Sequence, residues 1–163
     1  TPEEMTVTVD AATHRKLAID ANNSTWEFLG KDPADISENE AEEMTRRAYA
    51  AAYHWARAEG TGPVNEARAE WLLARVWVAR SNGAVALGHA RRCLGMCMTH
   101  RLVDFDLAYA HEATARALAC TGDAKAAADH LAAAREVEIA DAEDKAQVDS
   151  DLTAGPWFGL DSK

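Results

Sequence analysis

Alanine-rich stretches divided by short breaker segments constrain the fold of this chain more than any other feature. The breakers are KDPAD, GTGP, SNG and RLVDFD, and each contains glycine, proline or a residue that caps helices. Between them alanine recurs, proline is absent and no run of β-branched residues occurs. Alanine has the highest helix propensity, whereas strands favour β-branched and aromatic residues. The pattern therefore predicts an all-α protein.

The breakers divide the chain into six expected helices and a tail. Ser37 and Glu40 form a capping box, Asp104 is a natural N-cap, and Gly122 with Asp123 ends one helix and caps the next. The expected helices cover residues 11–30, 37–60, 63–81, 84–100, 105–121 and 124–144, and residues 150–163 form the tail. Trp157 and Phe158 in that tail are expected to be packed, since they would otherwise add exposed apolar surface.

Length and charge narrow the class of protein. A chain of 163 residues is expected to form a single domain, here residues 1–163. A net charge of −10 argues against nucleic acid and against an anionic membrane surface as partners, because both require clustered Lys and Arg. Three cysteines favour reduced thiols over disulfides. No signal peptide or membrane-spanning stretch is recognisable, so the expected location is cytoplasmic.

Two consecutive helix pairs share one internal spacing. The first pair has Glu70-x2-Leu73-Ala74-x2-Trp77 followed by Ala86-x3-Ala90-x2-Cys93. The second pair has His111-x2-Thr114-Ala115-x2-Leu118 followed by Ala127-x3-Leu131-x2-Ala134. Over residues 64–138 the chain resembles the tetratricopeptide-repeat family of helical repeats. The resemblance implies antiparallel helix pairs at 11–60, 64–100 and 104–140. The alternative is an irregular α-helical bundle.

The resemblance also implies a concave groove along the first helix of each pair. The residues expected to bind a ligand there are Arg68, Trp71, Arg75, Tyr109, Glu112 and Arg116. Arginine holds carboxylates and phosphates with paired hydrogen bonds, and aromatic rings supply flat apolar area. The expected partner is an acidic peptide, a protein or a small anionic ligand. In the alternative interpretation the arginines only pair with Glu70 and Glu112 on the surface.

The segment RRCLGMCMTH suggests a copper or zinc site. On a helix, His89, Cys93, Cys97 and His100 fall on one narrow stripe. However, His89 and His100 are separated by roughly 16 Å along the helix axis, which is too far for one ion to bind all four. A second helix would have to contribute ligands. The alternative is that both cysteines are core residues, since free cysteine is often buried.

No established catalytic motif and no cofactor-binding motif is evident in the sequence. A small enzyme remains an alternative, with His54, His111 and Glu112 as candidate catalytic residues around a cavity between helices. His89 would join them there. A third alternative is a homodimeric scaffold in which the apolar tail, residues 157–160, docks on a second copy.

Overall fold

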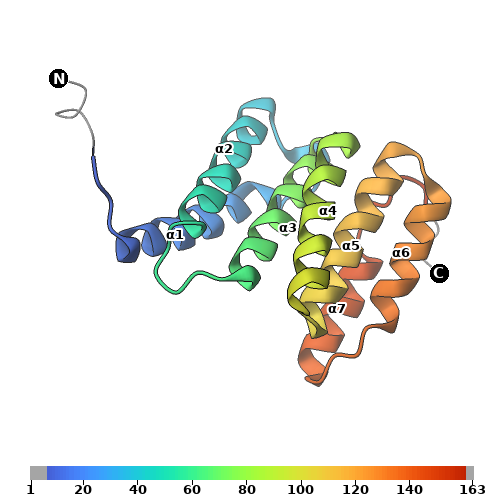
Figure 1. Cartoon of the computed structure of the whole chain (residues 1–163). Helices are drawn as coiled ribbons and strands as arrows, with labels where there is room; N and C mark the ends of the chain where they lie inside the picture. The colour runs from blue at the N-terminus through green and yellow to red at the C-terminus, as the bar shows by residue number, and fades with distance from the viewer. Residues whose placement is uncertain (1–6, 161–163) are drawn as a thin grey trace.

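The computed structural model describes residues 7–160, and this part of the chain is all-α, without strands (Figure 1). Seven α-helices and one short 3-10 turn follow one another along it. The helices are α1 (Ala11–Leu29), α2 (Glu38–Trp55), α3 (Pro63–Ala79), α4 (Gly83–His100), α5 (Asp104–Thr121), α6 (Ala124–Glu136) and α7 (Ala142–Thr153), with the turn η2 at Pro33–Asp35. The all-α prediction is confirmed.

Most helix ends match the capping residues in the sequence. The Ser37 hydroxyl accepts a hydrogen bond from the Glu40 N–H at the start of α2, and Pro63 is the first residue of α3. Gly122 ends α5 in the left-handed conformation, with a φ of 91°. Asp104 is the first residue of α5 rather than its N-cap, and its carboxylate accepts a hydrogen bond from the Ala140 N–H.

One predicted helix is two helices. The sixth was expected to continue to residue 144, but α6 ends at Glu136 and α7 begins at Ala142. The backbone is extended at Val137, within a stretch where Val and Ile alternate with Glu. The Asp141 carboxylate then accepts hydrogen bonds from two N–H groups of the first turn of α7. The count of six helices was therefore wrong, since α7 covers the expected end of the sixth helix together with residues that were expected to lie outside any helix.

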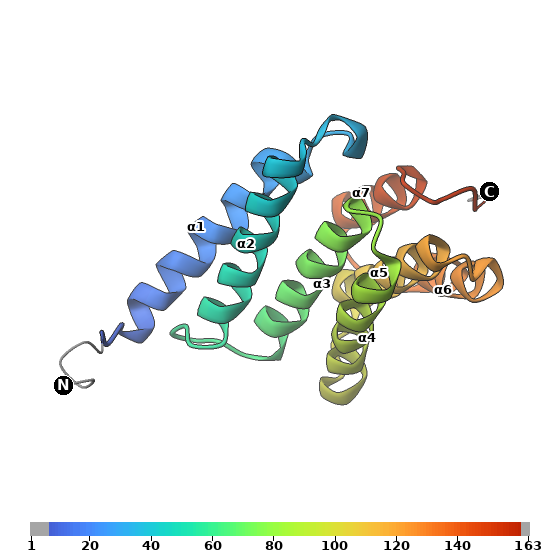
Figure 2. The same cartoon turned by 90° about the horizontal axis from the view of Figure 1, so that it is seen from above.

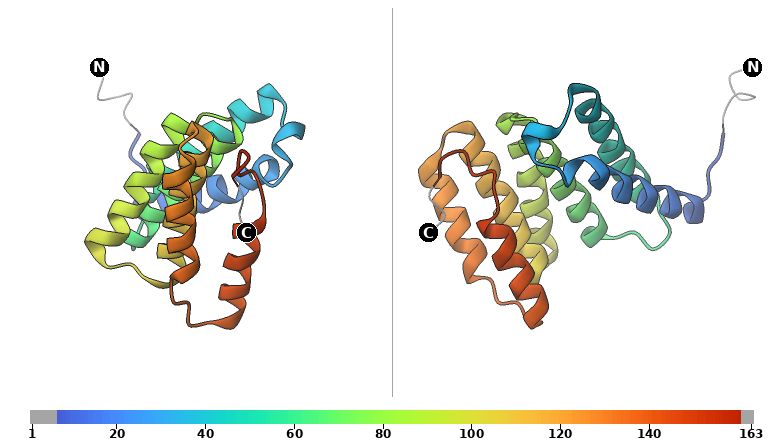
Figure 3. Two further views of the ribbon diagram at one scale, coloured as in Figure 1. Left: turned by 90° about the vertical axis from the view of Figure 1, so that its right-hand side faces the viewer. Right: turned by 180° about the vertical axis from the view of Figure 1, so that it is seen from behind.

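The helices pack mainly against their neighbours in the sequence, as Figures 1 and 2 show. In addition, α1 contacts α3, α3 contacts α5 and α5 contacts α7. The odd-numbered helices therefore lie along one side of the stack, and α1 and α7 are both visible on that side in the right-hand view of Figure 3. The first and last described helices lie at opposite ends of the molecule.

Small side chains allow the central helices to approach closely. Ala74, Ala86, Ala90, Ala113 and Ala117 are all buried in one cluster shared by α3, α4 and α5. Larger apolar side chains fill the two ends of the stack. Met44, Leu72 and Val76 pack between α2 and α3, whereas Leu131, Leu152 and Trp157 pack between α6, α7 and the segment that follows. Among the described helices, none combines the length and apolar character needed to cross a bilayer.

Candidate functional site: an aromatic pocket between α1, α3 and α5

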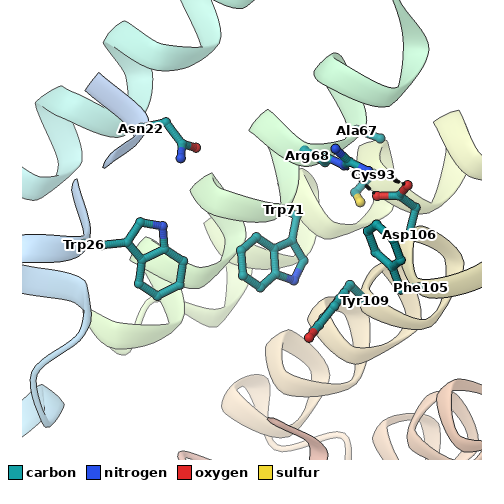
Figure 4. Close-up of a pocket in the computed structure, with 9 residues that line it drawn as sticks. All are labelled: Asn22, Trp26, Ala67, Arg68, Trp71, Cys93, Phe105, Asp106 and Tyr109. Carbon is teal, nitrogen blue, oxygen red and sulfur yellow. Dashed lines mark hydrogen bonds and ion pairs between the residues drawn. The ribbon is translucent and has the colours of Figure 1, made fainter. Parts of the chain in front are cut away.

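A pocket of about 360 Å³ opens between α1, α3 and α5, as Figure 4 shows. Three of the odd-numbered helices contribute most of its wall, and α4 adds a single buried cysteine. The pocket is lined by Asn22, Trp26, Ala67, Arg68, Trp71, Cys93, Phe105, Asp106 and Tyr109. Four of the nine lining side chains are aromatic, so a ligand there would contact mostly flat apolar surface.

Trp71 is the central ring of this aromatic wall. Its ring centroid lies 5.9 Å from that of Trp26 on α1 and 5.5 Å from that of Tyr109 on α5. The first pair is tilted by 31° and the second meets edge to face at 64°. Trp26 remains 36% exposed, so one face of the wall is open to a ligand. Asn22 and Trp26 share the same face of α1 because they are four residues apart.

An ion pair marks the polar edge of the pocket. Arg68 donates hydrogen bonds from Nε and Nη2 to the two carboxylate oxygens of Asp106, at 2.9 and 3.1 Å. These bonds raise the pKa of the Arg68 guanidinium. The Arg68 side chain also lies over the Phe105 ring, 5.2 Å from its centroid, and stays 53% exposed. Arg68 is therefore charged and accessible, although it is already paired.

A buried charge network lies next to the aromatic wall. The Trp71 Nε1–H donates to one oxygen of Glu112 at 2.9 Å, and the Arg116 Nε–H donates to the other at 2.8 Å. The Arg75 Nη1 lies 3.6 Å from the same carboxylate. Glu112 and Arg116 are each 1% exposed. Burial lowers the pKa of Arg116, an effect that the nearby Glu112 charge opposes.

The remaining donors of Arg116 bind the C-terminal segment. They donate to the backbone carbonyls of Asp151, Ala154 and Pro156 at 2.6, 2.8 and 3.2 Å. The guanidinium also lies 4.2 Å from the centre of the Trp157 ring, which is a cation–π contact. Trp157 is 7% exposed, so it packs within its own chain as expected. Phe158 beside it is 42% exposed, so the expectation that it packs is wrong.

Tyr109 links the pocket to α7. Its hydroxyl donates to the Asp151 carboxylate at 2.5 Å, and burial together with this bond raises the pKa of Tyr109. The phenol therefore stays neutral and fixed in place, presenting the ring to the pocket.

The six residues predicted to bind a ligand all lie on α3 and α5, but they fall into two groups. Arg68, Trp71 and Tyr109 line the pocket. Arg75, Glu112 and Arg116 do not line it and belong to the charge network. The alternative interpretation expected the arginines to pair on the surface. Arg116 does pair with Glu112, but this pair is buried, and Arg75 approaches Glu112 rather than Glu70.

Sequence reasoning missed the contribution of α1 and the start of α5. The missed lining residues are Asn22, Trp26, Phe105 and Asp106. The first helix pair fitted the repeat spacing only loosely, so α1 had no assigned groove face. The available signals were two spacings of four residues, Asn22 with Trp26 and Phe105 with Tyr109, each of which places both residues on one helical face.

The candidate catalytic residues do not share one site. His54 pairs with His14 of α1 at 2.8 Å between Nδ1 atoms, and His111 pairs with His130 of α6 at 3.0 Å. Burial, followed by the charge of the partner ring, lowers the pKa values of His54 and His111. Glu112 belongs to the charge network described above. None of these candidates lines the aromatic pocket.

The cysteines of α4 are core residues. Cys93 and Cys97 are 3% and 1% exposed and pack with Ala67 and Ala110. A hydrogen bond between the two thiols raises the pKa of Cys93 and lowers that of Cys97. Cys97 also donates to the Asp106 carbonyl oxygen at 3.8 Å. This geometry agrees with the packing interpretation of the sulfur segment.

The two histidines of the same stripe point elsewhere. His89 contacts Tyr49 and Glu70, and His100 is exposed at the end of α4. Within residues 7–160, no group of three or more His, Cys, Asp or Glu side chains is arranged to hold a metal ion. Copper or zinc binding at His89, Cys93, Cys97 and His100 therefore stays a prediction from the sequence alone.

Comparison of the chain with protein-family models, curated proteins and solved structures gives no match in any of the three.

Proposed function

We propose that this chain is a tetratricopeptide-like binding module whose ligand occupies the aromatic pocket between α1, α3 and α5. The observation that carries the proposal is the meeting of Trp26, Trp71 and Tyr109 from three different helices beside a half-exposed arginine, Arg68. Such a pocket offers apolar area together with one group that fixes the orientation of a ligand.

Corresponding contacts in two helix pairs support the repeat. The Glu70 carboxylate contacts His89 at 2.6 Å, and His111 contacts His130 at 3.0 Å. Both contacts join residues 19 positions apart, and the second pair lies 41 residues after the first (111 − 70 and 130 − 89). The same offset separates the two spacing patterns in the sequence, which begin at Glu70 and His111. Equivalent positions thus make equivalent contacts between the two helices of each unit.

The favoured ligand is a peptide or small molecule with a large apolar or aromatic group next to a carboxylate. The aromatic group would pack against Trp26 and Trp71. The carboxylate would compete with Asp106 for Arg68, whose side chain is 53% exposed. Arg75 and Arg116 contribute less to an anion, because Glu112 already neutralises charge beside them.

A homodimer formed through the tail has weaker support. Trp157, the largest side chain of that segment, is buried against Arg116 of its own chain. A ligand in the aromatic pocket is the better proposal than a dimer, because the pocket is open whereas Trp157 of the tail already packs within its own chain.

Selection from a random peptide library on the full chain tests the function. We expect selected peptides to share an aromatic residue close to an acidic residue or the C-terminal carboxylate. Trp26→Ala should weaken their binding about tenfold or more, roughly 1.4 kcal/mol or above. Arg68→Gln should weaken only the peptides that carry the carboxylate.

The matched control is Tyr53→Ala, which removes a 54% exposed aromatic residue on α2 away from the pocket. It should leave binding unchanged. Selected peptides that bind wild type and Trp26→Ala equally well would show that the pocket is not the binding site. Equal effects of Trp26→Ala and Tyr53→Ala would contradict the proposal in the same way.

A further inference from the structure

A hydrogen-bonded chain of side chains links α2, α3 and α4 outside the aromatic pocket. The Tyr49 hydroxyl lies 2.9 Å from Nε2 of His89, and Nδ1 of the same ring lies 2.6 Å from the Glu70 carboxylate. None of these three residues lines the pocket between α1, α3 and α5. Tyrosine, histidine and glutamate thus follow one another in the order nucleophile, base and orienting acid.

The neighbours of this chain determine where its protons lie. Nδ1 of His89 contacts both the Glu70 carboxylate, which can only accept a hydrogen bond, and Arg92 Nη2, which can only donate one. Donation to Glu70, the shorter of the two contacts, requires the tautomer with the ring hydrogen on Nδ1. Nε2 is then the acceptor for the Tyr49 hydroxyl. Arg92 Nε lies 3.3 Å from the Glu70 carboxylate, and Arg92 Nη2 lies 2.8 Å from Nδ1. Trp77 Nε1–H donates to the Tyr49 oxygen at 3.0 Å.

Burial separates the base from the reactive oxygen. His89 is 6% exposed and Glu70 is half-buried, whereas Tyr49 is 41% exposed. The imidazole is therefore shielded from solvent while the tyrosine remains accessible. A proton taken from Tyr49 would pass into the protein rather than into water, and Trp77 would stabilise the charge left on the phenolate oxygen.

A groove of about 400 Å³ lies between α2, α3 and α4. Its lining residues are Ala52, Ala56, Glu66, Ala69, Glu70, Arg92, Gly95, Met96 and Thr99. Glu70 and Arg92 therefore belong both to the groove and to the hydrogen-bonded chain, and Ala52 follows Tyr49 by one turn of α2. The small lining side chains leave space for a small organic molecule, one turn of α2 from Tyr49.

The equivalent positions of the next unit show what a purely structural pair requires. There, His111 and His130 join α5 to α6 with two side chains. Around the contact between α3 and α4, Tyr49 of α2 bonds the histidine, Trp77 bonds the Tyr49 oxygen, and Arg92 pairs with Glu70. A reactive hydroxyl needs these additional contacts, whereas helix packing alone does not require them.

We propose that Tyr49 is a nucleophile that accepts an acyl group from a small carboxylic ester bound in this groove. The Tyr49 oxygen attacks the ester carbonyl carbon while its proton passes to Nε2 of His89. The ester C–O bond breaks, the alcohol leaves with that proton, and the acyl group stays on Tyr49. Water then attacks the acyl-tyrosine and gives its proton to His89, which returns it to the Tyr49 oxygen. The sum is ester plus water giving acid plus alcohol.

Acetylation of the wild-type protein by p-nitrophenyl acetate tests this proposal. Tyr53, one turn along α2 and 54% exposed, is an internal control, because its described ring contacts provide no histidine nitrogen bonded to its oxygen. We expect a burst of one equivalent of p-nitrophenolate and an acetyl group on Tyr49, located by peptide mass spectrometry. Tyr49 should react roughly a hundredfold faster than Tyr53, the rate that a positioned base supplies.

Variants assign the roles. Tyr49→Phe should abolish the burst, His89→Gln should slow acetylation of Tyr49 to the rate of Tyr53, and Glu70→Gln should slow it partly. Tyr53→Phe should change nothing. The proposal is overturned if wild-type Tyr49 reacts no faster than Tyr53, or if the burst persists in Tyr49→Phe. The comparison within wild type remains decisive even if the buried His89→Gln variant fails to fold.

Discussion

Glu112 carries a charge in the interior of the helix stack, with 1% of its surface exposed. Its carboxylate is compensated by Arg116 at 2.8 Å, by the Trp71 indole at 2.9 Å and, at longer range, by Arg75. A buried ion pair contributes little net stability, but removal of one partner leaves an uncompensated charge. Because the Trp71 indole donates to Glu112, the conformation of Trp71 in the pocket depends on how the Glu112 charge is compensated.

We predict that Arg116→Met destabilises the protein by about 3–5 kcal/mol, because Glu112 loses its closest cation and the C-terminal carbonyls lose their donor. Urea unfolding followed by circular dichroism measures this change. The matched control is Lys125→Met, which removes a cation from an exposed pair with Asp129 at the same four-residue spacing. That variant should change stability by less than about 1 kcal/mol. Equal effects of the two substitutions would show that the buried network is not important for stability.

The sequence was sufficient to place the expected binding residues of each helix on one face, but not to establish the burial of Glu112 and Arg116. A spacing of three places Arg68 and Trp71 on one face of α3, and the resemblance to a helical repeat implied that Tyr109 shares this surface; all three line the pocket. The burial of Glu112 and Arg116 depends on carbonyl groups 35 to 40 residues later in the chain. No local pattern around Arg116 carries that information.

At the scale of the helices, caps were predictable and one interruption was not. Ser37, Gly122 and Asp123 act locally, so their roles follow from sequence alone. The break after Glu136 contains neither glycine nor proline, and Asp141 was read as one more helical residue. Because α7 was not predicted, its packing against α5 was not predicted either.

Two glycines of α4 give a matched test of helix packing. A Cβ atom on Gly83 would lie 2.8 Å from Thr121 Cγ2 and 2.9 Å from the Thr121 backbone nitrogen. Gly83→Ala should therefore push α4 away from the end of α5 and destabilise the protein by about 1–3 kcal/mol. A Cβ on Gly88 meets nothing within 4 Å, so Gly88→Ala should stabilise it by about 0.5–1 kcal/mol. Thermal unfolding distinguishes the two, and stabilisation by both would refute the close contact.

At the scale of the whole molecule, histidine pairs connect the helices at both ends of the stack. His14 with His54 joins α1 to α2, and His111 with His130 joins α5 to α6. The folded-state pKa values of His54 and His111 lie below the ordinary value of 6.5, mainly through burial. A lowered histidine pKa means that the folded state favours the neutral ring, so the stabilisation is complete above pH 6.5 and is lost as the pH falls below it.

We therefore predict that the urea midpoint of the protein falls between about pH 7 and about pH 5. The double variant His54→Gln, His111→Gln should show a smaller fall over the same range, because it lacks the two rings that resist protonation. The control is His100→Gln, a change to an exposed histidine at the end of α4. A double variant with the same pH dependence as wild type would rule out these pairs as its source.

Packing between sequence neighbours also has a consequence for the folding pathway. Contacts between adjacent helix pairs are local, which favours rapid folding from any point along the stack. The docking of α7 on α5 is an exception, because α6 lies between them in the chain. Loop closure makes such contacts late events. Glu112 and Arg116 are thus expected to remain hydrated until α7 docks, so the partly folded chain avoids desolvating either charge before its compensation is complete.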